Sequence, residues 1–109
     1  MDSLASPMPA AAQDHAARMR WRVEEIDWNG IDHARIADDE LLFYLLTSAS
    51  FIESGSDLYT RNLIGHYARW PEVAQWLGAH WEQEELQHGR AFAAYVQAAW
   101  PQFPWQQAF

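Results

Sequence analysis

Apolar and small side chains recur at every third or fourth position along two long stretches of the chain, which meet at Pro71. The first stretch spans residues 38–68 and carries this spacing at Leu42, Leu45, Leu46, Ala49, Ser50, Ile52, Ser56, Leu63, Ile64 and Tyr67. The second spans residues 71–99 and carries it at Ala74, Leu77, Trp81, His88, Phe92, Tyr95, Val96 and Ala99. Because an α-helix repeats every ~3.6 residues, each stretch predicts one long amphipathic helix.

The two predicted helices have recognisable ends. Asp38 or Asp39 caps the first, since a carboxylate accepts hydrogen bonds from the free N–H groups of a first turn. Pro71 opens the second, because proline fits a first turn and pushes the preceding residue out of the helical region. Gly55 and Gly65 cost about 1 kcal/mol each inside the first helix, which weakens it without breaking it. So short a connection makes the helices antiparallel neighbours, and we predict an all-α fold built on a long helical hairpin.

Shorter segments precede the hairpin. Residues 1–10 are rich in Pro, Ala and Ser and are expected to form a flexible tail. Residues 11–22 predict a short helix, and residues 23–37 predict irregular or short helical structure. Residues 11–109 together are expected to form a single helical domain. Three side chains of the N-terminal part are expected to dock on an apolar surface: Trp21, Ile26 and Trp28.

The composition fits one small folded domain and limits the classes of partner and of metal site that the chain can have. Half of the 109 residues are hydrophobic, which is enough for a small core. A formal net charge of −8 argues against nucleic acid or an anionic membrane as partner, because both attract clustered Lys and Arg. The chain has no Cys, which excludes thiolate zinc sites and iron–sulfur clusters. Any metal here must therefore use His nitrogen and carboxylate oxygen.

The sequence shows neither a secretory signal nor a membrane span. The first residues include an early Asp2 and lack the apolar segment of a signal peptide. The longest uninterrupted apolar run is residues 41–46, far short of the roughly 20 residues that cross a bilayer. We therefore predict a cytoplasmic protein.

Glu85 and His88 form a Glu-x-x-His pair, and positions three apart on a helix face the same way. Two-metal carboxylate bundles combine such a pair with a lone Glu from the adjacent helix. Glu53 is the candidate: at ~1.5 Å per residue it lies about 25 Å from the turn, against about 22 Å for Glu85 and about 27 Å for His88. The sequence therefore predicts a metal site at one level of the hairpin, made by these three residues.

Two alternatives stay open for these ionisable residues. A Glu-x-x-His pair arises by chance about 0.4 times in a chain of this composition. Glu82, Glu84 and Glu85 therefore alternatively form an exposed acidic face beside His88 in the core. His80, Glu84 and His88 also form a stripe at intervals of four, which suits zinc but leaves the first helix without a ligand.

Two stretches of the sequence resemble a known family. "EELQHG" at 84–89 resembles the Glu-Glu-x-x-His-Gly signature of soluble acyl-carrier-protein desaturases, which belong to the ferritin-like di-iron carboxylate superfamily together with other iron-containing redox enzymes. "FIESGSDLYT" at 51–60 is similar to the preceding helix of that family, in which a Glu ligand is followed by a Tyr. The resemblance covers roughly residues 40–96 and implies half of a four-helix bundle.

The resemblance implies a di-iron centre and an oxidoreductase. Glu53 and His88 would be terminal ligands and Glu85 would bridge two irons, whereas Glu84 points away. Manganese also suits such a carboxylate site. The implied activity is oxygen activation, of oxidase or desaturase type, on an apolar or carrier-bound substrate. No catalytic residue is identified, although Tyr59 and Trp81 are candidates for carrying an electron or radical; core aromatics are far commoner.

The family pattern needs six ligands and this chain supplies three, because no Glu follows residue 89. The apolar ending at Trp105, Ala108 and Phe109 predicts the opening of a third helix. We therefore expect either a polypeptide that continues past Phe109 with the other half-bundle, or a second copy that completes the site as a homodimer. Three ligands alone are expected to bind metal weakly or not at all. Ferritin-type iron oxidation and storage, and a metal-free helical interaction module, are the alternative functions.

Overall fold

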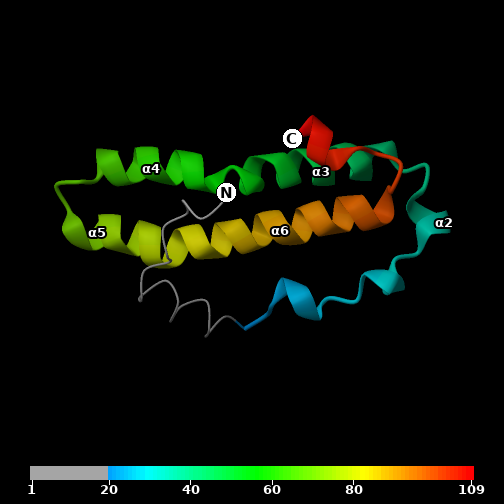
Figure 1. The fold of residues 1–109 in the computed structure, drawn as a ribbon, viewed down its shortest axis with the longest axis horizontal. Coiled ribbons are helices and arrows are strands. Elements are labelled where there is room, and N and C mark those ends of the chain that lie inside the picture. The colour runs from blue at the N-terminus through cyan, green and yellow to red at the C-terminus, as the bar shows by residue number, and fades with distance from the viewer. Residues whose placement is uncertain (1–19) are drawn as a thin grey trace, which may run out of the picture.

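The computed structural model describes residues 20–109, and within that range every regular element is a helix (Figure 1). The all-α class predicted from the sequence is confirmed. The long elements are α3 (Glu40–Ser54), α4 (Ser56–His66), α5 (Pro71–Trp76), the π-helical segment η4 (Leu77–Trp81) and α6 (Glu82–Ala99). The short ones are η2 (Val23–Glu25), η3 (Trp28–Gly30), α2 (His33–Ile36) and α7 (Trp105–Ala108). None of the helices in the described part is both long and apolar enough to cross a membrane.

Two long helical arms lie side by side and run in opposite directions (Figure 1). α3 and α4 form the first arm, α5, η4 and α6 form the second, and a short turn before Pro71 joins them. The first arm begins where predicted, because the Oδ1 of Asp39 accepts a hydrogen bond from the N–H of Leu42 at 3.0 Å. The second begins at Pro71, and the backbone of Trp70 before it is non-helical. The arms thus bring residues far apart in the sequence to the same level.

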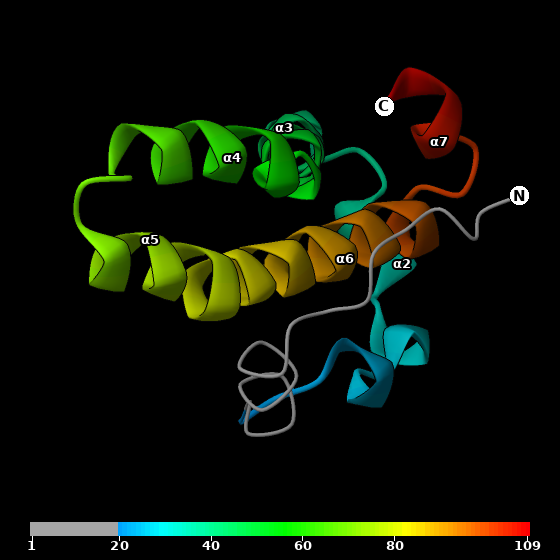
Figure 2. The same cartoon turned by 60° about the vertical axis from the view of Figure 1, so that its left-hand side comes forward.

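The first arm is not one helix, and the prediction that Gly55 weakens it without breaking it is wrong. α3 ends at Ser54 and α4 begins at Ser56, and the two helices run in clearly different directions (Figure 2). Side chains take over backbone acceptors at the break. The Ser56 hydroxyl donates to the carbonyl of Glu53 at 2.5 Å, and the Thr60 hydroxyl donates to the carbonyl of Ser56 at 2.6 Å. The arm also ends at His66, short of the predicted residue 68.

The second arm is helical throughout the predicted range 71–99, but it contains a π-helical segment that the sequence did not indicate. At its end the N–H of Glu82 donates to the carbonyl of Leu77, five residues back. π-Helical turns are rare inside α-helices and are frequent at functional sites. This one ends directly before the acidic run that carries the predicted ligands.

The hydrophobic core lies between α3 and the C-terminal half of α6, and α7 contributes Trp105 to it. Its buried members are Ala93, Val96, Ala99, Trp100 and Trp105. The indole N–H of Trp105 donates to the hydroxyl of Ser50 at 2.8 Å, and that hydroxyl donates to the carbonyl of Thr47 at 2.6 Å. The helix predicted to open near the C-terminus is therefore α7, which is four residues long and anchored on α3.

The N-terminal segment runs along the far side of α6 (Figure 1). The predicted tail 1–10 and most of the predicted helix 11–22 lie outside the described residues; of the latter, residues 20–22 are not helical. Residues 23–37 form short helical turns, as expected. Trp28 packs edge-on against Tyr95, with ring centroids 6.2 Å apart. Ile26 and Trp21 are each 38% exposed, so both side chains are covered only in part.

Candidate metal centre

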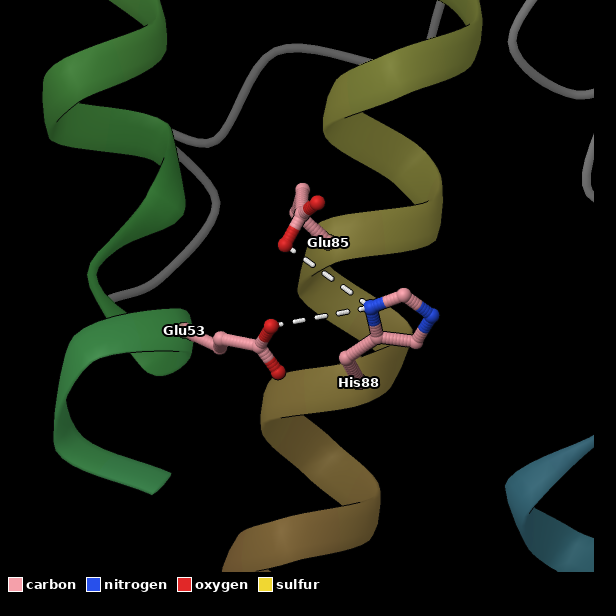
Figure 3. Close-up of side chains that lie close together, drawn as sticks. All are labelled: Glu53, Glu85 and His88. Atoms are coloured by element: carbon pink, nitrogen blue, oxygen red, sulfur yellow. Dashed lines mark ion pairs between the residues drawn. The ribbon is translucent and has the colours of Figure 1, made fainter. Parts of the chain in front are cut away.

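Glu53 of α3 points across to Glu85 and His88 of α6, and the three side chains meet between the two arms (Figure 3). The Nδ1 of His88 lies 3.7 Å from a carboxylate oxygen of Glu53 and 3.7 Å from one of Glu85. One ligand atom from each residue lies within 4.8 Å of the other two. Among residues 20–109 no other group of three or more His, Asp and Glu side chains gathers in this way. The structure thus brings together the three residues that were predicted to lie at one level of the hairpin.

Gly89, next to His88, sets the distance between the arms at this level. A Cβ atom at position 89 would lie 2.8 Å from the backbone carbonyl of Glu53 and from the N–H nitrogen of Ser54. Only glycine allows two helical backbones to approach so closely. The Ser54 hydroxyl adds a contact of 3.5 Å to the carbonyl of Gly89. The glycine of the "EELQHG" stretch therefore brings Glu53 within reach of His88.

Glu53 carries an electrostatic cost in this position. Its Oε2 is buried and has no hydrogen-bond partner. Burial raises the pKa of Glu53, the negative charge of Glu85 raises that pKa further, and His88 lowers it. The contacts of 3.7 Å are also too long to be hydrogen bonds. Two carboxylates facing one imidazole are thus incompletely neutralised, and a cation between them would supply the missing charge.

The N-terminal segment holds His88 from its other side. The rings of Trp21 and His88 are nearly parallel, with an interplanar angle of 7° and centroids 6.0 Å apart. The Gln87 side chain donates to the backbone carbonyl of Trp21 at 3.0 Å, which fixes this segment on α6. Sequence reasoning placed Trp21 on an apolar surface and missed this role, because nothing in the spacing of the N-terminal residues points to α6.

Glu82 lies one turn before Glu85 and is the buried acid that sequence reasoning missed. It is 5% exposed, and its nearest cation is the largely exposed Arg61, 3.8 Å away. Burial raises the pKa of Glu82, Arg61 lowers it, and Asp57 raises it. Because Glu85 is also largely buried, Glu84 is the one exposed member of the acidic run. The alternative of an exposed acidic face is therefore wrong.

Replacing Glu82 with glutamine is expected to stabilise the protein at pH 7 by about 1 kcal/mol. A buried acid with a raised pKa is favourable while protonated. Its contribution to the free energy of unfolding is therefore complete below 4.5, the ordinary pKa of Glu. That contribution is lost as the pH rises through the raised pKa of the folded state. Urea unfolding between pH 4 and 8 measures this effect. The free energy of unfolding of Glu82→Gln should fall less steeply with rising pH than that of the wild type. Parallel curves would contradict a raised pKa at this position.

The remaining candidates are placed elsewhere. His80 lies in the π-helical segment, and the stripe of His80, Glu84 and His88 does not form a group of ligand distance in the described part of the chain. Tyr59 and Trp81 contact each other edge-on, with centroids 5.7 Å apart. The Tyr59 hydroxyl also lies 2.9 Å from the hydroxyl of Ser56. These two aromatic residues are therefore packed as a pair between α4 and the π-helical segment.

Comparisons with protein-family models, with curated proteins and with solved structures find no match.

Proposed function

We propose that Glu53, Glu85 and His88 bind a metal ion and form half of the ligand set of a di-iron carboxylate centre. The observation that carries this proposal is the convergence of two carboxylate oxygens and one imidazole nitrogen from two helices within 4.8 Å. Ligands at about 2.1 Å from one ion lie about 3 to 3.5 Å from each other. Small side-chain rotations therefore suffice to close the observed group on an ion.

The surroundings of the three ligands support the same proposal. The buried Oε2 of Glu53 lacks a partner, which is costly unless something charged meets it. Gly89 removes the side chain that would hold the arms apart. Both arms depart from regular α-helix close to the ligands, at Gly55 and in the segment that ends at Trp81. Such irregularities cost stability, and they recur where a backbone positions functional groups.

The donor set favours iron or manganese in a ferritin-like oxidoreductase. Mixed carboxylate and imidazole ligands suit these ions, which when bound supply oxygen activation. In this proposal Glu53 and Glu85 neutralise and hold the ion, while Trp21 keeps the ring of His88 oriented. The same two helices carry apolar side chains such as Leu46 and Phe92, which suit an apolar or carrier-bound substrate. Tyr59 and Trp81 are the candidate route for an electron.

The proposed centre needs a second set of ligands. Bundles of this class use a Glu and a Glu-x-x-His pair from each half, and residues 20–109 gather one such set. The other set would come from a further part of the polypeptide or from a second copy. The single set alone is therefore expected to bind metal weakly or not at all.

Anaerobic titration with Fe(II), followed by calorimetry, tests the proposal. Glu85→Ala and His88→Ala are each expected to weaken Fe(II) binding at least about 10- to 100-fold, the loss usual even for groups that only support a ligand. Glu84→Ala is the matched control, because it removes the neighbouring, exposed carboxylate and should leave the affinity within about twofold. Equal affinities for wild type, Glu85→Ala and His88→Ala would contradict the metal site.

A further inference from the structure

One side of α3 carries a row of large apolar side chains that nothing in the described structure covers. Leu41, Leu45, Ser48 and Ile52 succeed one another at intervals of four, three and four residues. Tyr44, the residue before Leu45, is also exposed and extends the row at one flank. We call these five residues the α3 stripe. The interval pattern is that of the a and d positions of a coiled coil, which pack against another helix.

The α3 stripe is large enough to be the centre of an interface. Its four large side chains are between 59% and 70% exposed. They present on the order of 500 Å² of surface, within the range of the largest patches that monomers expose. A stable interface buries about 800 Å² per partner, so the stripe would supply more than half of it. No charged residue occurs between Glu40 and Glu53, so α3 is apolar or small on every side, as helices buried on all sides are.

We propose that the α3 stripe pairs with the α3 stripe of a second copy of this chain, antiparallel about a two-fold axis. A two-fold contact requires a patch that complements itself. Ser48 lies at the middle of the stripe, and a small side chain at the axis lets two helices approach closely. Leu45 of one copy then meets Ile52 of the other, and the reverse. An uncharged surface matches this arrangement, since no like charges are brought together.

This contact stands independently of the metal centre. Thr47 and Ser50 are buried on the side of α3 opposite the stripe. Glu53 follows Ile52, so it lies about a quarter turn away from the stripe. A copy docked on the stripe lies beside the three ligands and does not cover them. Pairing is therefore expected in the presence of a chelator and in His88→Ala.

Sedimentation velocity of the full chain in EDTA tests the pairing. The wild type is expected to sediment at twice the chain mass of 12.6 kDa, with a dissociation constant of about 10 µM or lower. Leu45→Glu places two carboxylates in the contact and should raise that constant at least about 100-fold. Val73→Glu is the control, since it changes an exposed apolar residue of α5 outside the stripe and should leave the constant unchanged. Circular dichroism confirms that both variants keep their helices.

A cysteine at the axis identifies the surface. The chain has no Cys, so Ser48→Cys introduces a single thiol, and two such thiols face each other in the proposed pair. Mild oxidation should give a covalent dimer from Ser48→Cys and little from Gln75→Cys on α5. A monomer at all concentrations would overturn the proposal and leave the α3 stripe to a partner of different sequence. A dimer that resists Leu45→Glu or fails to cross-link at position 48 would overturn the assigned surface.

Discussion

Replacing Gly89 with alanine is expected to lower the free energy of unfolding by about 1–3 kcal/mol and to weaken metal binding in the same variant. The new Cβ would lie 2.8 Å from backbone atoms of Glu53 and Ser54, a separation that van der Waals contact does not allow. Because backbone atoms of a helix cannot rotate aside, α3 and α6 must move apart at this level. Glu53 and His88 then separate, and their distance of 3.7 Å grows.

Gly65→Ala is the matched control for this effect. Gly65 lies in α4, and a Cβ there would meet nothing within 4 Å. Alanine at this position is therefore expected to raise the free energy of unfolding by about 0.5–1 kcal/mol, through helix propensity alone. Urea unfolding of both variants, with Fe(II) titration of each, measures the difference. A stabilising Gly89→Ala would show that the arms do not touch at the metal site.

The positions of the arms and of the three candidate ligands follow from features that the sequence displays directly. Helical spacing located both arms, and Pro71 fixed where they meet. Once the turn is known, distance along a helix is a simple function of residue number, so Glu53 falls at the level of Glu85 and His88. These features are local or additive, which is why they can be predicted from one sequence.

The features that were missed depend on contacts between distant segments. Hydroxyl groups bind neighbouring carbonyls at the break after Ser54, but the Ser50 hydroxyl makes the same kind of bond inside unbroken α3, so such bonds do not reveal the break in the sequence. Burial of Glu82 depends on α4 covering it, and the stacking of Trp21 on His88 depends on how the N-terminal segment folds back. The π-helical segment likewise leaves no repeating pattern of apolar side chains by which the sequence could reveal it. Such details are set by tertiary packing and not by periodicity.

Replacing Glu53 with leucine is expected to stabilise the metal-free protein and to abolish its stabilisation by iron. Without metal, the buried Oε2 of Glu53 lacks a partner and its carboxylate faces that of Glu85, so an apolar side chain should gain about 1 kcal/mol or more. With Fe(II) at about 100 times its dissociation constant, the wild type gains about 2.7 kcal/mol, whereas the variant loses a ligand and gains little. The order of the two stabilities therefore reverses when iron is added.

Anaerobic urea unfolding of wild type and Glu53→Leu, each with and without Fe(II), measures this reversal. Glu84→Leu controls for adding an apolar side chain in place of a carboxylate on the same bundle, because Glu84 lies on the exposed side of α6 and should show neither effect. The four-way comparison separates the two iron-binding functions, oxidoreductase and iron storage, from the metal-free interaction module. If Glu53→Leu is stabilised and iron leaves the wild type unchanged, the carboxylate is no ligand in the single chain and the metal-free interaction module is favoured. If Glu53→Leu is less stable than the wild type in EDTA, another group of the protein stabilises the Glu53 carboxylate. Burial of that carboxylate then does not destabilise the metal-free fold. In the proposed function, an ion bound by Glu53 offsets the cost of burying its carboxylate.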